Sequence, residues 1–243
     1  MDVHEYEKRI AALERENRIL RQKLYRNEIN RAMLEEMLET HSRALKVRNE
    51  ELEVSRELIE KSEAMYRDLA HRDALTRLPN RVFFLECLVQ GLARAKCSNT
   101  CIALLFLDLD QFKPVNDNLG HDAGDIVLSQ TAERLLSCVR NKGTVARIGG
   151  DEFAILLEDL HDHTTAKRIG DKIISTLSKP FLVAGEACQL GTSIGISLYP
   201  HDDDDPERLL QKADMAMYNV KKTRCNNYCF YSEITTLNQL RNV

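Results

Sequence analysis

The sequence predicts two regions, a long coiled-coil helix over residues 1–70 and an α+β domain over residues 71–243 with a mostly antiparallel central sheet flanked by helices. Three observations lead to this prediction. The first 70 residues contain no glycine and no proline, and they repeat apolar residues every seven positions. The remaining residues alternate between helical and strand patterns. Two of the expected connections between strands are hairpins, which join antiparallel neighbours.

The N-terminal region has the heptad pattern of a two-stranded coiled coil. The seven-residue repeat consists of Ile10, Asn17, Leu24, Arg31, Leu38, Leu45, Leu52, Ile59 and Tyr66, and the residues three positions later include Leu13, Leu20, Asn27 and Leu34. The first set are the a positions of the heptad and the second set the d positions. Asparagine at an a position, here Asn17, favours a parallel dimer in one register. From about residue 41 the d positions become polar, which indicates a stutter or weaker pairing of the helices.

A single solvated helix is the alternative for this region, but its apolar stripe would then have no partner. We therefore expect a homodimer formed through the coil. The coil is also the place where we expect a regulatory protein to act.

The composition makes several classes of function improbable. The chain has 34 basic and 38 acidic residues, so broad electrostatic binding to nucleic acid or to an anionic membrane is not expected. The longest apolar run, residues 101–107, is too short to cross a bilayer, and the N-terminus lacks the apolar segment of a secretion signal. Seven cysteines without a CxxC spacing are typical of reduced thiols, so we expect a cytoplasmic protein without a zinc site.

The pattern of the second region predicts five helices and six strands. The expected helices are 80–96, 113–119, 123–140, 163–178 and one that begins at Pro206; the expected strands are 100–110, the hairpin pair within 144–158, 180–184, 187–199 and 228–232. Asp205 before Pro206 has the composition of a helix N-cap followed by a good first residue. We interpret the rest of the acidic run at 201–205 as a solvated loop and not as a metal site.

Carboxylates gather at the ends of two expected strands. Asp108 and Asp110 end one strand, where alternation puts both on one face. An acid in such a place is more often a turn or helix-cap residue, and Asp110 fits that description. Asp151 and Glu152 stand side by side at the hairpin tip. If the two strands are neighbours, these acids repel one another unless a cation joins them, and oxygen-only ligands suit Mg²⁺ or Mn²⁺.

Two glycines, Gly149 and Gly150, precede the hairpin acids. An ordinary hairpin turn would need only Asn-Gly or Asp-Gly. Two residues without side chains let a phosphate or a flat base lie directly against the backbone. The hairpin tip therefore has the composition of a site that binds both a metal ion and a charged ligand.

Five blocks, in order, resemble the GGDEF family of diguanylate cyclases: DALTRLPNR (73–81), LDLDQFKPVNDNLGHDAGD (107–125), RIGGDEF (147–153), SIGIS (193–197) and ADMAMYNVKK (213–222). The resemblance covers about residues 71–232. It implies a fold similar to the palm domain of polymerases and adenylyl cyclases. It also implies a bacterial signalling enzyme that uses Mg²⁺ to condense two GTP molecules into cyclic di-GMP, with release of pyrophosphate. Two GTP sites must then face each other, which agrees with a homodimer.

The resemblance also implies a role for each matching residue. The Mg²⁺ ligands would be Asp108, the carbonyl of Leu109, Asp151 and Glu152, and the last of these would also help to remove the 3′-hydroxyl proton. The phosphates would contact Lys113, Lys221, the backbone at Phe112 and the backbone of Gly149 and Gly150. The guanine edge would be recognised by Asn116 and Asp125, which favours GTP over ATP. Without the resemblance, Lys113 and Asn116 read as a polar helix face and Asp125 as an acid in a first helical turn.

Two positions depart from the family pattern. The product-inhibition motif RxxD appears here as RNKG, so that Gly143 replaces its acid and weak feedback is expected. After Lys221 the family continues toward Gly-Arg-Asn, whereas this chain places Arg224 one position early and Cys225 where the arginine belongs. A degenerate module that binds GTP or cyclic di-GMP without turnover is therefore an alternative function. A coiled-coil scaffold that recruits a partner is a third, but it leaves the acids unexplained.

Overall fold

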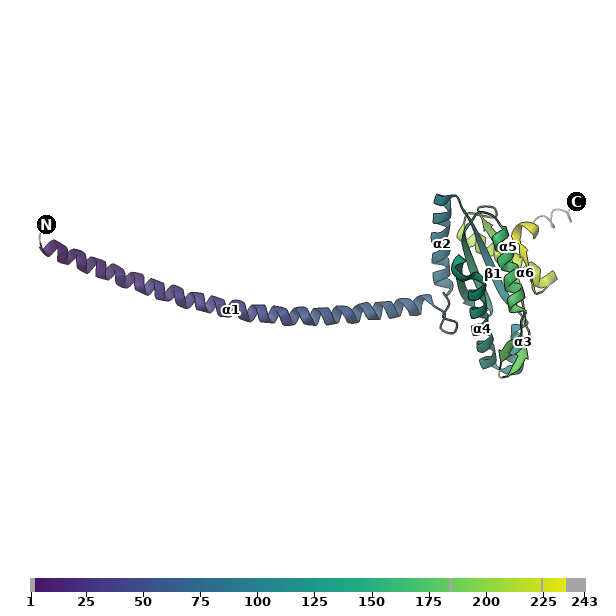
Figure 1. The fold of residues 1–243 in the computed structure, drawn as a ribbon, viewed down its shortest axis with the longest axis horizontal. Coiled ribbons are helices and arrows are strands. Elements are labelled where there is room, and N and C mark those ends of the chain that lie inside the picture. The colour runs from purple at the N-terminus through teal and green to yellow at the C-terminus, as the bar shows by residue number, and fades with distance from the viewer. Residues whose placement is uncertain (1–2, 184, 224, 235–243) are drawn as a thin grey trace. The chain divides into compact units, whose positions relative to one another are not determined.

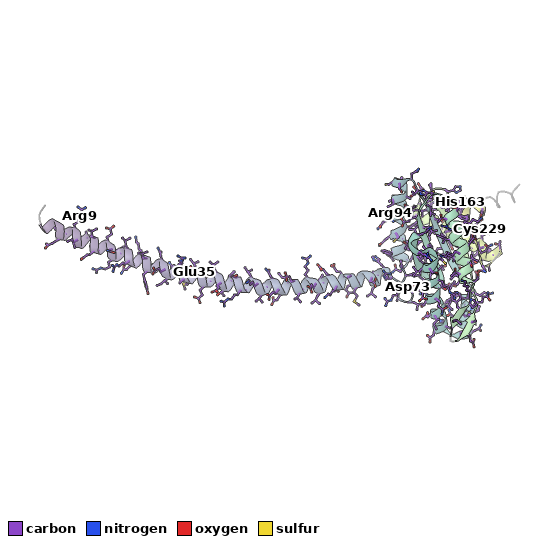
Figure 2. The ribbon with its side chains drawn as sticks, in the orientation of Figure 1. Arg9, Glu35, Asp73, Arg94, His163 and Cys229 are labelled. Carbon is purple, nitrogen blue, oxygen red and sulfur yellow. The ribbon has the colours of Figure 1, made fainter. Side chains whose placement is uncertain are left out.

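The computed structural model describes residues 3–183, 185–223 and 225–234, and the chain divides into two compact units between Met65 and Tyr66 (Figure 1). One helix, α1 (Val3–His71), makes up the whole described part of the first unit. Its 69 residues correspond to a length of about 100 Å. The heptad side chains are exposed along this helix, and Figure 2 shows side chains projecting from both edges of its ribbon. The continuous helix is confirmed, and its pairing with a second copy stays a prediction.

The second unit is built on a five-stranded sheet in the order β2-β3-β1-β6-β7. The strands are β1 (Cys101–Asp110), β2 (Gly143–Gly149), β3 (Glu152–Leu160), β6 (Gly191–Tyr199) and β7 (Asn227–Phe230). All neighbours are antiparallel except β6 and β7, which run parallel. The mostly antiparallel α+β fold is therefore confirmed.

One expected strand is wrong, because residues 187–199 do not form a single strand. Residues 186–188 are β5 (Glu186–Cys188), which pairs with β4 (Phe181–Val183) in a separate two-stranded ribbon. Leu190 then turns into the core before β6 begins. The apolar pattern runs through this break, so it gives no local sign that the chain changes sheets.

Helices cover both faces of the sheet, and β1 contributes alternate side chains to each face. Ile102, Leu104 and Phe106 pack with two helices, α2 (Arg81–Ser98) and α6 (Pro206–Thr223). Ala103, Leu105 and Leu107 pack on the opposite face, where the helices are α3 (Phe112–Leu119), α4 (His121–Val139) and α5 (Thr164–Leu177). This alternation also puts Asp108 and Asp110 on the face of α2 and α6.

The helix α6 lies directly against β6 at Gly195. A Cβ atom at this glycine would collide with the carbonyl oxygen of Ala213 and the backbone nitrogen of Met217. Only glycine therefore lets the helix backbone approach the strand so closely. This contact sets the height of α6 above the sheet, and with it the position of Lys221 in the last turn.

The acidic run before α6 is not the solvated loop that we expected. The side chain of Asp202 is 3% exposed and accepts a hydrogen bond from the Leu198 backbone nitrogen at 2.7 Å. The side chain of Asp203 is 7% exposed and pairs with Lys212 at 2.7 Å. Asp205 does cap α6, because its carboxylate accepts from the backbone nitrogen of Arg208 at 2.9 Å. The loop folds back on itself because these acids bind its own backbone and the helix that follows.

Within the described part of the chain, no helix has both the length and the apolar character that spanning a bilayer demands.

Candidate active site

The sheet register brings the predicted acids together. Asp108 on β1 lies directly opposite Glu152 on β3 and opposite Ser193 on β6. The backbone nitrogen of Leu109 also donates to the carbonyl oxygen of Asp151 at 3.4 Å. The two acid-bearing strands are therefore neighbours, as the acid-cluster hypothesis required.

The acid cluster carries more negative charge than its surroundings neutralise. The side chain of Asp108 is 9% exposed, and its Oδ2 lies 2.6 Å from the Nζ of Lys221. Burial raises the pKa of Asp108 to about 6; Lys221 acts in the opposite direction, and the charges of Asp151 and Glu152 add to the rise. Burial also raises the pKa of Glu152, with further contributions from Asp214 and Asp151. Two cations, Lys221 and Arg81, act on a cluster of four carboxylates, so a bound cation would stabilise it.

The donor set fits a hard divalent cation. Asp108, Asp151 and Glu152 offer only oxygen atoms, which is the ligand chemistry that Mg²⁺ and Mn²⁺ prefer. Among the residues that the structure describes, no three Asp, Glu, His or Cys side chains converge closely enough to form a metal-binding group. The acids are thus adjacent but not gathered around one point, and Lys221 occupies one carboxylate oxygen of Asp108. The assignment of Mg²⁺ ligands stays a prediction.

The raised pKa of Asp108 predicts a stability gain when its charge is removed. Ionised Asp108 costs folding free energy at neutral pH, because its pKa rises from 3.8 in the unfolded chain to about 6 in the folded one. We expect Asp108→Asn in metal-free protein to gain about 1–3 kcal/mol of unfolding free energy. The gain should be full above about pH 6 and should vanish as the pH falls to 3.8.

Urea unfolding in EDTA across this pH range measures the effect. Asp117→Asn, a substitution of an exposed acid on α3, is the matched control and should show no such gain. A variant Asp108→Asn that is less stable than the wild type at every pH would contradict the electrostatic account.

The two glycines of the hairpin tip lie beneath open space. A Cβ atom at either Gly149 or Gly150 would meet no heavy atom within 4 Å. Gly150 also has a φ of +53°, a turn conformation that side chains rarely adopt. Gly149 has neither a packing reason nor a positive φ to be glycine. Space for a ligand is the reason that is left for Gly149.

Gly149→Ala should therefore separate folding from ligand binding. Alanine at a compatible backbone position stabilises a fold by about 0.4–1 kcal/mol, because the unfolded chain loses freedom. We expect this variant to unfold at the wild-type temperature or above it, but to bind GTP at least about tenfold more weakly. Thermal unfolding and titration with a fluorescent GTP analogue measure the two effects. Gly150→Ala is the comparison, since its φ of +53° should make it less stable. Unchanged nucleotide affinity in Gly149→Ala would exclude a ligand above this backbone.

An arginine that the sequence analysis did not single out fixes the hairpin tip. Arg147 donates to the carbonyl oxygen of Gly150 from Nε at 3.0 Å and from Nη2 at 2.8 Å. Its Nη1 pairs at 3.0 Å with Asp73, a residue of the loop between α1 and α2 (Asp73 is labelled in Figure 2). Burial alone would raise the pKa of Asp73, but hydrogen bonds from Thr76 and Arg147 lower it. The only signal in the sequence was that both residues fall in family-like blocks.

The predicted nucleotide-binding residues lie on α3 and at the start of α4. Phe112 is buried, Lys113 and Asp125 are exposed, and Asn116 is partly exposed. Asn116 packs so closely on Gly124 that a Cβ atom there would collide with its side-chain oxygen. The close approach of the two helices therefore brings Asn116 next to the turn that carries Asp125. Their roles toward GTP stay predictions.

The end of α6 carries Lys221 next to the acid cluster. Lys221, which the resemblance places at the phosphates, pairs here with Asp108, and its role toward the phosphates stays a prediction. Cys225 is exposed, and its Sγ donates to the carbonyl oxygen of Lys221 at 3.4 Å. Arg224, the candidate to replace the missing arginine, lies outside the described residues. At the feedback motif, a Cβ atom at Gly143 would collide with the carbonyl oxygen of Leu156, so this backbone has no room for the missing acid.

Asp110 is neither a turn residue nor a helix cap, which corrects our expectation. It is the last residue of β1, it is buried, and both of its carboxylate oxygens accept hydrogen bonds from distant segments. The residue at the cap position of α3 is Gln111, and it forms no side-chain cap.

Comparison with known proteins agrees with the geometry. The family described as "Diguanylate cyclase, GGDEF domain" matches residues 70–227. The diguanylate cyclase TpbB of Pseudomonas aeruginosa is 43% identical over 174 residues, which are 71% of this chain and 40% of TpbB. The chain thus spans less than half of the length of this curated relative.

Two solved structures extend the similarity. The GGDEF domain of TpbB from P. aeruginosa superposes with a TM-score of 0.65 at 42% identity, and the match covers 68% of this chain and 99% of that one. The coiled coil and GGDEF domain of DgcB from Caulobacter crescentus, in complex with c-di-GMP, has a TM-score of 0.69 at 25% identity and covers 76% of this chain and 98% of that one. The family match over residues 70–227 agrees with the opposed acids of β1 and β3 and with the glycine tip. The chain therefore belongs to the GGDEF family of diguanylate cyclases.

Proposed function

We propose that the chain is an active diguanylate cyclase that works as a homodimer. In the reaction, two GTP molecules form one cyclic di-GMP and two pyrophosphates. Each 3′-oxygen forms a bond to the α-phosphorus of the other nucleotide while the bond to pyrophosphate breaks. One observation carries this proposal. Asp108 and Glu152 lie opposite each other where β1 ends and β3 begins, beside a glycine tip with open space above it.

The chain's own residues would divide the work as follows. Asp108, Asp151, Glu152 and the carbonyl of Leu109 would hold Mg²⁺ or Mn²⁺, which supplies positive charge for the 3′-hydroxyl and the phosphates when bound. Glu152, whose pKa is raised by burial, would accept the 3′-hydroxyl proton. Lys113 would neutralise phosphate charge. Asp125 would accept hydrogen bonds from the guanine N1–H and amino group, which adenine lacks.

Homodimerisation through α1 is part of the proposal. One domain offers one glycine tip, whereas the reaction needs two nucleotides that face each other. A coil that joins two copies raises the local concentration of the second domain. The solved structure of DgcB, which contains a coiled coil and a GGDEF domain, supports such an arrangement.

A module that binds GTP or cyclic di-GMP without turnover is the second candidate, and Cys225 favours it. This residue replaces a cation in the family pattern, and its Sγ bonds to the helix backbone. Incubation with GTP and Mg²⁺ separates the candidates. Cyclic di-GMP with twice as much pyrophosphate, and no product from ATP, supports the cyclase; GTP binding without pyrophosphate supports the second candidate.

Restoring the arginine should improve a working cyclase. A charge-assisted hydrogen bond is worth about 1.5–3 kcal/mol, so we expect Cys225→Arg to lower the KM for GTP or raise the rate by about ten- to a hundredfold. Steady-state kinetics at several GTP concentrations measure this. Cys97→Arg is the control, since it changes another exposed cysteine far along the chain and should have no effect.

The kinetic effect of Cys225→Arg depends on whether Arg224 already contacts the phosphates. If Arg224 already supplies the charge, Arg224→Ala should be strongly impaired and Cys225→Arg should add little. Kinetics unchanged in both variants would show that this end of α6 does not touch phosphate.

A further inference from the structure

The buried carboxylate of Asp110 joins three segments that are far apart in the sequence. Asp110 is 9% exposed. Its Oδ1 accepts from the Oγ of Ser193 on β6 at 2.7 Å, and its Oδ2 accepts from the backbone nitrogen of Asn226 at 2.7 Å. Gly191 makes room for this junction, because a Cβ atom there would lie 2.8 Å from Oδ2 of Asp110. Both oxygens are therefore used within the protein.

Asn226 is the residue at which the chain turns from α6 into β7. It has a φ of +58°, a left-handed conformation that asparagine tolerates better than most residues. Its side-chain amide donates to the Oγ of Ser178 at 3.0 Å, and its Oδ1 accepts from the Thr192 backbone nitrogen at 3.3 Å. The turn is thus held on both sides, and Asp110 holds its backbone.

This turn follows directly on the part of α6 that carries Lys221. Lys221 lies five residues before Asn226, and its Nζ reaches Asp108 at 2.6 Å. Asp108 and Asp110 are two residues apart on the same face of β1. One acid of this strand therefore holds the side chain of Lys221, and the other holds the backbone of Asn226, three residues after the helix ends.

We propose that Asp110 is a positioning residue: it fixes the turn after α6, through the backbone of Asn226, and so places Lys221 at the active-site carboxylate. Asp110 is not a metal ligand, although it lies in the same acid-rich strand end as Asp108. The consequences for GTP and for Asp108 as a metal ligand rest on the proposed function, whereas the hold of Asp110 on the turn does not.

The hydrogen-bond pattern distinguishes a positioning residue from a metal ligand, because an amide can keep the hydrogen bonds of this carboxylate without its charge. In Asp110→Asn, the side-chain oxygen still accepts from the nitrogen of Asn226, and the side-chain amide donates to Ser193, whose hydroxyl can also accept. The same change at a metal-ligating carboxylate would weaken metal binding, since the amide oxygen carries no net charge.

The test compares Asp110→Asn with Asp108→Asn in the full chain. Mn²⁺ affinity without nucleotide is measured by electron paramagnetic resonance, and affinity for a non-hydrolysable GTP analogue is measured by calorimetry, so neither depends on turnover. We expect Asp110→Asn to stay within threefold of the wild type in both, while Asp108→Asn loses at least tenfold in Mn²⁺ affinity. Equal loss of Mn²⁺ affinity in the two variants would overturn the proposal.

A second comparison tests whether Asp110 acts through Lys221. Asp110→Ala should weaken binding of the analogue by about as much as Lys221→Met, and the double variant should be no worse than either single one, since both remove the same placed cation. Fully additive losses would overturn the proposal. If Asp110→Ala does not fold, Ser193→Ala takes its place, because it removes only one hydrogen-bond partner of Asp110. We expect Ser193→Ala to lose less affinity for the analogue, and to cause no further loss when Lys221→Met is already present. The analogue gives these answers whether or not the wild type makes cyclic di-GMP, so failure of the cyclase proposal remains a separate result.

Discussion

Asp151→Asn is expected to abolish formation of cyclic di-GMP while the fold stays intact. Asp151 precedes the first residue of β3, and its charge acts on both Asp108 and Glu152. Asparagine keeps the shape of the side chain but is uncharged and binds Mg²⁺ weakly. Because a metal ion stabilises the charge of the reaction by several kcal/mol, its loss should reduce turnover about a thousandfold or more. Product formation measured by chromatography, with thermal unfolding in parallel, gives the result.

Asp159→Asn is the matched control for this variant. It makes the same chemical change near the other end of β3, where Asp159 is exposed and has a φ of +53° that asparagine tolerates. We expect wild-type turnover from this control. Turnover of Asp151→Asn within a few-fold of the wild type would refute the metal assignment, provided that both variants unfold at similar temperatures.

Deletion of residues 1–65 should leave a folded domain with little activity at micromolar concentration. The second compact unit begins at Tyr66, so the deletion removes none of its sheet or core. Two domains must meet for the reaction, and linkage through a coil is worth about 10²–10⁴ in effective concentration. We therefore expect specific activity to fall by about a hundredfold or more and to recover in part as protein concentration rises. Activity assays over a dilution series, together with sedimentation, measure both effects.

Point variants in the intact helix control for the deletion. Leu24→Glu and Leu38→Glu together place charges in the heptad seam, whereas Ile29→Glu places one on another exposed apolar residue, outside the seam. The seam variant should sediment as a monomer with low activity, and the control should remain a dimer. A wild-type chain that sediments as a monomer at micromolar concentration would exclude the dimer proposal.

Local patterns predicted the central architecture well. The alternation along residues 101–110 gave the correct faces for the apolar residues and for Asp108, since a strand leaves only two sides on which a residue can lie. The hairpin acids would meet Asp108 only if their strands were neighbours, and the register shows that Glu152 lies opposite Asp108. Asp205 at the start of α6 was recognised because a helix cap depends on neighbours within three residues.

Contacts between distant segments were the ones that sequence patterns missed. Asp110 was interpreted as a turn or cap, but its partners Ser193 and Asn226 lie more than 80 residues further along the chain. The pairing of Lys221 with Asp108 likewise needs the packing of α6 on the sheet. No local pattern contains such information, because each of these polar groups is satisfied only after the fold has formed.

The bare contact between Gly195 and the backbone of α6 affects how mutational tolerance in this domain should be interpreted. A side chain at position 195 would lift the helix from the sheet and carry Lys221 away from Asp108, so this glycine should be as intolerant of change as a residue that binds substrate. Gly195 itself is buried beneath the helix and has no surface to offer a nucleotide. Functional intolerance therefore marks two different populations of residues here, those that meet the ligand and those that set the spacing between backbone layers. A systematic mutagenesis of the domain would therefore identify the ligand-binding residues only after the residues that set this spacing had been set aside.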